Sequence, residues 1–284
     1  MTQPPRRYLR LPFGNDRLSL VATIVLVLLV LAGLLAPLLP IGDPEAIGAG
    51  PRLSPPTGDF PLGTDNLGRP MLARIFEGIL LTFVVSTIAV LIASVVGAIL
   101  GMIAAYTHRA LDETVSRIAD MLFSFPPVLL GLLVTAILSP GIHSAVAAIV
   151  LITLPAMVRV VRAATLDIAR RDFVIVAEVA GASFGRRLFL HLLPNTAGVV
   201  AVQTAYSISL GMLIESALSF LGLGVQPPSA SLGSLLREGA LYLDIAPWLA
   251  FGPGALLAAA ILSVNLFGDG LRAIVDPLEA RPLR

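Results

Sequence analysis

Residues 78–107 read GILLTFVVSTIAVLIASVVGAILGMIAAYT, and this stretch decides the fold class because it contains no charged side chain. A helix needs roughly 20 apolar residues to cross the ~30 Å hydrocarbon core of a bilayer, and the stretch exceeds that length. Hydrophobic residues make up 56% of the 284 and charged residues 13%, a composition far from that of a soluble domain. Further uncharged stretches lie at 18–42, 121–158, 192–214 and 245–268. The sequence therefore predicts an all-α, polytopic membrane protein.

The uncharged stretch at 121–158 is long enough for two membrane spans. It is interrupted at 139–144 by SPGIHS, whose serines, proline and glycine are typical of a turn. Dividing the stretch at this turn gives six predicted transmembrane helices, and the proline pair of SFPPV (124–128) is expected to kink the third. The approximate bounds are 18–41, 76–106, 119–139, 143–163, 193–216 and 245–268.

The second predicted helix carries GAILG at 97–101, with two glycines four residues apart. Small residues at this spacing let two helices approach closely in lipid. We therefore expect a helix-packing contact here. Residues 42–75, which precede this helix, are rich in proline and glycine and are predicted to form an irregular extracytoplasmic loop.

The first apolar run follows several arginines, an arrangement that a cleaved signal peptide also shows. Residues 18–41 are longer than the ~7–15 residues of a signal-peptide core, and no small-residue cleavage site closes them. We expect a retained first helix, preceded by a cytosolic tail at 1–17.

All 19 basic residues are arginine, and their distribution predicts the orientation. With the N-terminus in the cytosol, fifteen arginines lie in cytosolic segments and four lie outside, which is a strong positive-inside bias. Both termini are thus expected in the cytosol, with the C-terminal tail at 273–284. The net charge of +1 gives no indication of nucleic-acid binding. The four outside arginines are Arg52, Arg69, Arg74 and Arg237.

Missing residue types exclude several chemistries. The chain has no lysine, and a phosphate-binding P-loop needs one, so an ATPase site of this kind is excluded. It has no cysteine, so it forms neither disulfides nor thiolate sites. His108, His143 and His191 are scattered at the ends of predicted helices, so no metal site or cofactor is expected. No nucleophile and base form a pattern either, and we expect a chain that is not itself an enzyme.

The segment between the fourth and fifth predicted helices is too apolar for a solvated linker. From Asp167 to Ala180 it suits a short amphipathic helix, with an apolar stripe at helical spacing, and Gly181 is expected to end it. SFGRRLFLHLLPN (183–195) then starts a helix that enters the fifth span. An exposed apolar stripe indicates a partner, but the helix could also lie on the lipid surface or fold back onto its own bundle. The stripe consists of Phe173, Val176, Ala177 and Ala180.

A second unusual connection covers 215–244. It is too rich in glycine and proline for another span, and we expect a loop that dips back towards the bundle. Glu215 stands at its start. An ionisable group at membrane depth usually has a function, but a hydrated structural carboxylate at the boundary is an equal alternative. The same reading applies to Asp120.

Five blocks of the chain resemble the permease subunits of binding-protein-dependent ABC importers, in particular the C-type subunit of the peptide/nickel group. Together they extend from about 61 to 278 and follow the order of that family. They are PLGTDNLGRPMLARIFEG (61–78), DMLFSFPPVLLGLL (120–133), RRDFVIVAEVAGASFGRRLFLHLLPN (170–195), ESALSFLGLGVQPPSASLGSLLREG (215–239) and LFGDGLRAIVDP (266–277).

The resemblance implies a type I ABC importer transmembrane fold, with the core at 76–272 and a cytosolic coupling (EAA) loop at about 165–192 that docks into an ATPase subunit. The implied partners are a homologous second permease, two ATPase subunits that bind the ATP, an extracytoplasmic solute-binding protein and membrane lipid, and the implied location is the prokaryotic plasma (inner) membrane. Ile175 stands where the family usually has glutamate, and Glu178 where it usually has a basic residue. Pro70 and Leu232 also depart from the pattern. The implied coupling residues are Asp172, Phe173, Val176, Ala177, Gly181, Ala182 and Ser183.

The loop after the fifth span is our candidate for contact with the solute or the binding protein. Its expected residues are Glu215, Ser219, Phe220, Gly222, Gly224, Pro227 and Pro228. A secondary transporter or channel without ATPases is the alternative function. No predicted span carries an acidic or basic residue near its midpoint, where ion coupling would need one. The cargo stays open among dipeptides, longer peptides, nickel chelates and other small solutes.

Overall fold

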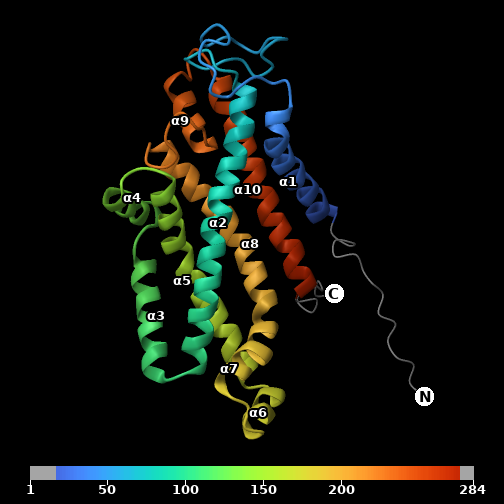
Figure 1. Cartoon of the computed structure of the whole chain (residues 1–284), viewed down its shortest axis with the longest axis vertical. Helices are drawn as coiled ribbons and strands as arrows, with labels where there is room; N and C mark the ends of the chain where they lie inside the picture. The colour runs from blue at the N-terminus through green and yellow to red at the C-terminus, as the bar shows by residue number, and fades with distance from the viewer. Residues whose placement is uncertain (1–16, 276–284) are drawn as a thin grey trace, which may run out of the picture.

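The computed structural model describes residues 17–275, so the expected tails at 1–17 and 273–284 lie almost wholly outside the described residues (Figure 1). Within this range no strand is present, apart from an isolated bridge between Thr64 and Pro70. The helices are α1 (Arg17–Leu35), η1 (Ala36–Leu38), α2 (Met71–Tyr106), α3 (Arg109–Ser124), α4 (Pro127–Leu138), α5 (Ile142–Ala169), α6 (Asp172–Val179), α7 (Phe184–Arg187), the π-helical turn η2 (Leu188–Leu192), α8 (Leu193–Phe220), α9 (Leu232–Leu241) and α10 (Trp248–Val275).

Five helical segments of the described chain are long and apolar enough to cross a membrane, and the bent pair α3–α4 raises the number to six. The all-α, polytopic prediction is confirmed. Helices α2, α5, α8 and α10 extend along the molecule, with α6 and α7 at one end and α9 and the 42–70 loop at the other (Figure 1). We refer to these as the α6 end and the α9 end.

The GxxxG pattern of α2 forms its contact with α5. A Cβ atom added at Gly97 would lie 2.8 Å from the Cβ of Met157, and one at Gly101 would lie 2.7 Å from the carbonyl oxygen of Val158. Only glycine permits so close an approach of the two backbones. The helix-packing prediction for 97–101 is therefore confirmed.

The third predicted span is broken rather than kinked. Helices α3 and α4 meet at an angle of 96°, so 119–139 is not one straight helix. Phe125 is extended, as expected for a residue before proline, and Pro126 and Pro127 remove two backbone donors at the junction. Residues 107–118, between the second and third predicted spans, were expected to form a cytosolic loop, but α3 already begins at Arg109.

Helix α3 is held against α5 by two ion pairs along its length. The Arg162 guanidinium forms a two-point contact with the Asp112 carboxylate, with Nη2 2.6 Å from Oδ2. Arg159 pairs with Asp120 and lies over the Phe123 ring, 4.3 Å from its centroid. Asp120 is an exposed carboxylate, so its hydrated, structural interpretation agrees with the structure.

Several helices extend beyond their predicted ends. Helix α2 begins at Met71 instead of 76, α5 continues to Ala169, α8 to Phe220 and α10 to Val275. The extensions of α2, α5 and α10 cross charged residues, which the hydropathy pattern treats as a boundary. The helix α9 was not predicted as a helix at all, because glycines and serines dominate its surroundings.

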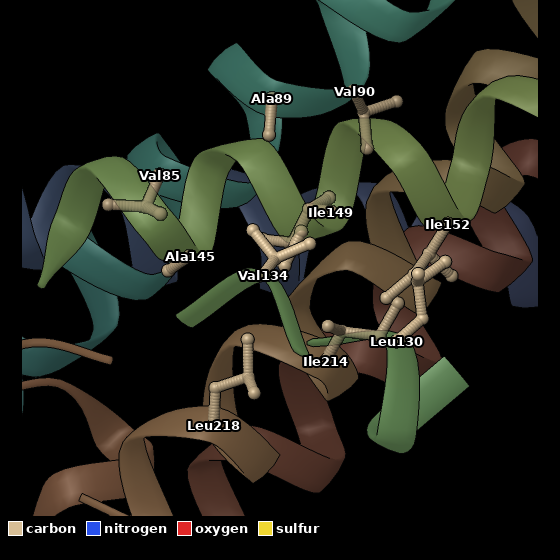
Figure 2. Close-up of a cluster of buried hydrophobic side chains, with 11 residues drawn as sticks. Val85, Ala89, Val90, Leu130, Val134, Ala145, Ile149, Ile152, Ile214 and Leu218 are labelled. Carbon is tan, nitrogen blue, oxygen red and sulfur yellow. The ribbon is translucent and has the colours of Figure 1, made fainter. Parts of the chain in front are cut away.

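The central core contains side chains from four helices (Figure 2). Leu130 and Val134 of α4 pack there against α2, α5 and α8, so the short transverse helix is an integral part of the bundle. The other labelled members are Val85, Ala89, Val90, Ala145, Ile149, Ile152, Ile214 and Leu218. Outward-facing leucine, isoleucine and valine side chains of α1 and α2 stay exposed, as expected of surfaces that meet lipid.

Candidate functional site

The short helix α6 projects from the α6 end between the two long helices α5 and α8 (Figure 1). Helix α5 ends at Ala169, so residues 167–169, which were expected in the amphipathic helix, belong to α5 instead. Arg170 and Arg171 form the turn, and α6 begins at Asp172, which is exposed.

Gly181 ends α6 in a Schellman motif. Its φ is +78°, the left-handed conformation that favours glycine. The amide of Ala182 donates to the carbonyl of Ala177 at 3.0 Å, and the amide of Gly181 donates to that of Glu178 at 2.9 Å. The prediction that Gly181 terminates the helix is confirmed. Ser183 then caps α7, because its hydroxyl accepts from the amide of Arg186.

The apolar surface of α6 points mostly away from the protein. Val174 is the one buried residue of the helix, at 1% exposure. The predicted stripe is largely uncovered, with Phe173 40% and Val176 65% exposed, and Ala177 half-buried. Val179, which lies outside that stripe, is 83% exposed. The helix therefore presents a broader apolar surface than the periodicity predicted.

Val174 connects α6 to the bundle. It belongs to a buried cluster that includes Ile168 of α5 and Leu188 and Leu192 of η2. Phe173 adds a looser contact, since its ring centroid lies 6.2 Å from that of His191. A single buried side chain thus provides most of the anchorage of this helix.

The turn after α6 is braced by Arg187. Its Nη1 lies 2.6 Å from Oε1 of Glu178, and its guanidinium lies 5.1 Å from the centroid of the Tyr106 ring. Tyr106, at the end of α2, also stacks on Phe184 of α7 with centroids 5.7 Å apart. The position where the family usually has a basic residue, Glu178, is therefore used for an ion pair within the chain.

At the α9 end, Glu215 is fully buried, so its hydrated interpretation is wrong. Helix α8 continues past it to Phe220, and Ser219 Oγ donates to its Oε1 at 2.6 Å. The hydroxyls of Thr82 in α2 and Ser231 before α9 also lie against the carboxylate. Glu215 thus joins three elements through hydroxyl groups.

The loop that follows folds back onto the end of α8, as the sequence predicted. The amide of Val225 donates to Ser219 Oγ at 3.1 Å. Gly224 is buried, and it lies so close to that oxygen that an added Cβ would be 2.1 Å from it. Phe220, Pro227 and Pro228 are exposed. Gly222 adopts a φ of +80°. The predicted residues of this loop therefore divide into a buried set and an exposed set.

Helix α9 continues this packing. Its N-terminus has a capping box between Ser231 and Ser234, and the amide of Leu232 donates to Thr82 Oγ1 of α2 at 3.1 Å. A Cβ at Gly239 would lie 2.6 Å from the backbone nitrogen of Ala250 in α10. Leu232, where the family usually has tryptophan, is completely buried.

A buried ion cluster at this end was not predicted. Arg74 Nη1 lies 2.6 Å from Asp65 Oδ2 and 2.6 Å from Glu238 Oε2, and Arg69 Nε lies 2.6 Å from Asp65 Oδ2. Arg74 and Asp65 are each 1% exposed. The cluster connects the 42–70 loop, α2 and α9. The sequence offered one signal for this cluster that sequence reasoning did not use: its four charged residues all lie within two of the blocks that resemble the permease family, 61–78 and 215–239.

The structure shows two candidate sites at opposite ends. The predicted coupling residues from Asp172 to Ser183 lie together at the α6 end, and the predicted loop residues from Glu215 to Pro228 lie together at the α9 end. Among residues 17–275, no three His, Cys, Asp or Glu side chains form a group that could hold a metal ion.

The chain is similar to several known proteins along nearly its whole length. The chain is 35% identical over 271 residues to the di/tripeptide transport system permease protein DppC of Pseudomonas aeruginosa, covering 93% of this chain and 89% of that protein. It is 35% identical over 271 residues to the dipeptide transport system permease protein DppC of Haemophilus influenzae, covering 93% and 92%. For the DppC protein of Alkalihalophilus pseudofirmus the identity is 34% over 263 residues, covering 93% and 86%.

The family model of the binding-protein-dependent transport system inner membrane component matches residues 97–280, which include α3 to α10 and both candidate sites. With this match and relatives that align along nearly the whole chain, the protein belongs to the family of inner membrane components of binding-protein-dependent transport systems.

Proposed function

We propose that this chain forms half of the translocation pathway of an ATP-driven importer for peptides or related small solutes. Members of its family are membrane components of transport systems and not enzymes themselves. The peptide cargo is proposed because the relatives are named as dipeptide or di/tripeptide permeases. A secondary transporter without ATPases is not favoured by this family membership.

The proposed complex contains a second, homologous permease, two ATPase subunits and an extracytoplasmic binding protein, in the inner membrane of a prokaryote. The α6 end faces the cytosol in this arrangement. Arginine distribution supports that orientation, since the α9 end has only the four arginines at 52, 69, 74 and 237. ATP is bound by the partner subunits, because this chain has no lysine for a P-loop.

The observation that carries the proposal is the uncovered apolar surface of α6. Phe173, Val176 and Val179 are 40%, 65% and 83% exposed on a helix of 8 residues. Full burial of one such side chain contributes about 1.5–3 kcal/mol, so a docked partner would stabilise this helix considerably. Ile175, exposed where the family usually has glutamate, adds to an apolar contact with the ATPase instead of an acidic one.

We infer that α6 acts as a lever. Closure of the ATPase subunits on ATP would move α6, and α5 and α8 would carry that displacement into the bundle, so that access alternates between the two sides. Coupling free energies of this kind are typically about 1–3 kcal/mol. At the α9 end, the exposed residues Phe220, Pro227 and Pro228 are proposed to contact the solute or the binding protein. The buried Glu215 and Ser219 would hold that loop in place.

Gly181→Asp tests the docking. A Cβ at Gly181 meets no atom within 4 Å, so the substitution causes no clash; it places a new charge at the dock and strains the turn, where φ is +78°. We expect normal membrane insertion but loss of the ATPase subunits that co-purify with the wild-type complex. Gly48→Asp is the control, because Gly48 lies in the loop at the α9 end, has a φ of +74° and also has no atom within 4 Å. Normal ATPase recovery with Gly181→Asp, or a wild-type chain that purifies without any ATPase, would contradict the proposed docking.

A further inference from the structure

A cavity of about 120 Å³ lies between α9 and the loop that precedes it. Polar side chains line part of it, including Gln226, Ser229 and Ser234. Two charged side chains, Arg237 and Glu238, also line the cavity. This volume suits one small polar group, whereas pockets for whole drug-sized ligands are about 300–1,000 Å³.

Of the two charged side chains that line this cavity, the one without a partner among the described residues is positive. Glu238 is already engaged, since its carboxylate accepts from Arg74 Nη1 at 2.6 Å and Nη2 at 3.2 Å. Arg237 is exposed, and within residues 17–275 no hydrogen bond or ion pair joins its guanidinium to another side chain or to the backbone. Of the four arginines at this end, Arg69 and Arg74 are buried in ion pairs. Arg52 lies on the exposed loop outside the cavity lining.

The loop before α9 leaves room for the Arg237 guanidinium at Gly222. A Cβ at Gly222 would lie 2.5 Å from Arg237 Nη1 and 2.9 Å from its Cζ, so the side chain rests directly on the glycine backbone. Gln226 Nε2 donates to the carbonyls of Gly222 at 3.2 Å and Gly224 at 2.9 Å, which fixes the loop beneath it. The position of Arg237 is thus defined by the fold although its hydrogen-bonding capacity is unused.

We propose that this cavity binds the terminal carboxylate of the transported peptide, with Arg237 as its anchor. The inference rests on the proposed function, since it assigns a recognition site for the proposed cargo. A guanidinium matches a carboxylate with two parallel hydrogen bonds, a geometry that an ammonium group does not offer. The Ser229 hydroxyl, which has no partner among the described residues, supplies a further donor at the cavity wall.

The test compares uptake of trialanine and of trialanine amide by the complete complex in proteoliposomes. The affinity of the binding protein for each peptide is measured separately, and uptake is compared at equal occupancy. Arg237→Gln is expected to lower uptake of the free acid about tenfold or more, the size of a lost charge-assisted bidentate contact, while uptake of the amide changes little. Arg237→Lys should retain part of the preference for the acid. Arg52→Gln is the matched control and should leave both rates unchanged.

Several results would overturn the assignment. If Arg237→Gln lowers both rates equally and weakens docking of the loaded binding protein, then the carboxylate belongs to that protein and not to the peptide. Unchanged rates for both peptides would show that Arg237 recognises neither. If the wild-type complex moves neither peptide, then the proposed function itself fails and the carboxylate site falls with it. A loss confined to the free acid supports the assignment.

Discussion

Val174 and Val176 of α6 offer a matched test of the lever, because the same substitution at the two positions separates anchoring from docking. Val174 is 1% exposed and packs against Ile168, Leu188 and Leu192, whereas Val176 is 65% exposed. Val174→Ala removes two buried methyl groups at about 0.8 kcal/mol each, and the remaining cavity raises the cost to roughly 2–3 kcal/mol. That cost is as large as the entire coupling free energy of about 1–3 kcal/mol expected between two sites.

We therefore expect Val174→Ala to loosen α6 from the bundle while leaving its outer surface intact. ATPase subunits should still co-purify, but the number of solute molecules transported per ATP hydrolysed should fall severalfold. Val176→Ala should behave in the opposite way, with weaker ATPase binding and a normal ratio in complexes that do form. Both quantities can be measured in proteoliposomes, with ATPase recovery determined from the purified complex. A wild-type transport ratio for Val174→Ala, or identical defects in the two variants, would refute the reasoning.

Three further predictions concern single positions. Gly181→Ala should destabilise the turn by about 1–2 kcal/mol, because φ is +78° there, whereas Gly181→Asn should be tolerated better because asparagine adopts this left-handed conformation more readily. An equal transport rate for the two variants would argue against the turn geometry. Arg74→Met should leave the carboxylates of Asp65 and Glu238 with Arg69 as their one remaining partner in the cluster, and should destabilise the protein by about 3–5 kcal/mol, seen as a lower melting temperature in detergent; Arg52→Met in the exposed loop should melt like the wild type. Gly101→Ala should separate α2 from α5 and lower the melting temperature, at a cost of about 1–3 kcal/mol, because its Cβ would lie 2.7 Å from a backbone oxygen. Gly254→Ala, whose Cβ would have its nearest atom at 3.4 Å, is the control, and equal melting temperatures for the two variants would contradict the close packing.

The sequence predicted those parts of the fold that depend on local composition. Long uncharged stretches identified the membrane-spanning helices, the glycines of 97–101 identified a close contact, and Gly181 identified the end of α6. In each case one chemical property determines the structure, namely transfer into lipid, the absence of a side chain, or a left-handed backbone. Such features can be predicted without knowing which residues lie next to them in space.

The features that escaped prediction depend on neighbours distant in sequence. Glu215 looked like a boundary residue because it is charged, but the hydroxyls of Thr82, Ser219 and Ser231 let it be buried within α8. The pairing of Arg74 with Glu238 joins positions 164 residues apart, which no local pattern reveals. Helix α9 has four leucines among its ten residues, but it is short and lies among glycines, serines and prolines, and it packs against α8 and α10. The candidate coupling site was therefore more predictable than the site at the α9 end.

The π-helical turn at Leu188–Leu192 has a consequence for how this protein can change over evolution. Such a turn holds one more residue than the α-helical path would, and each residue of a helix rotates the following chain by about 100°. Deleting or inserting one residue here would leave α8 helical but would rotate α7 about the helix axis relative to α8. The direction in which α6 and α7 project from the bundle therefore depends on the one extra residue of this turn. Length changes in this short stretch should be far rarer than substitutions.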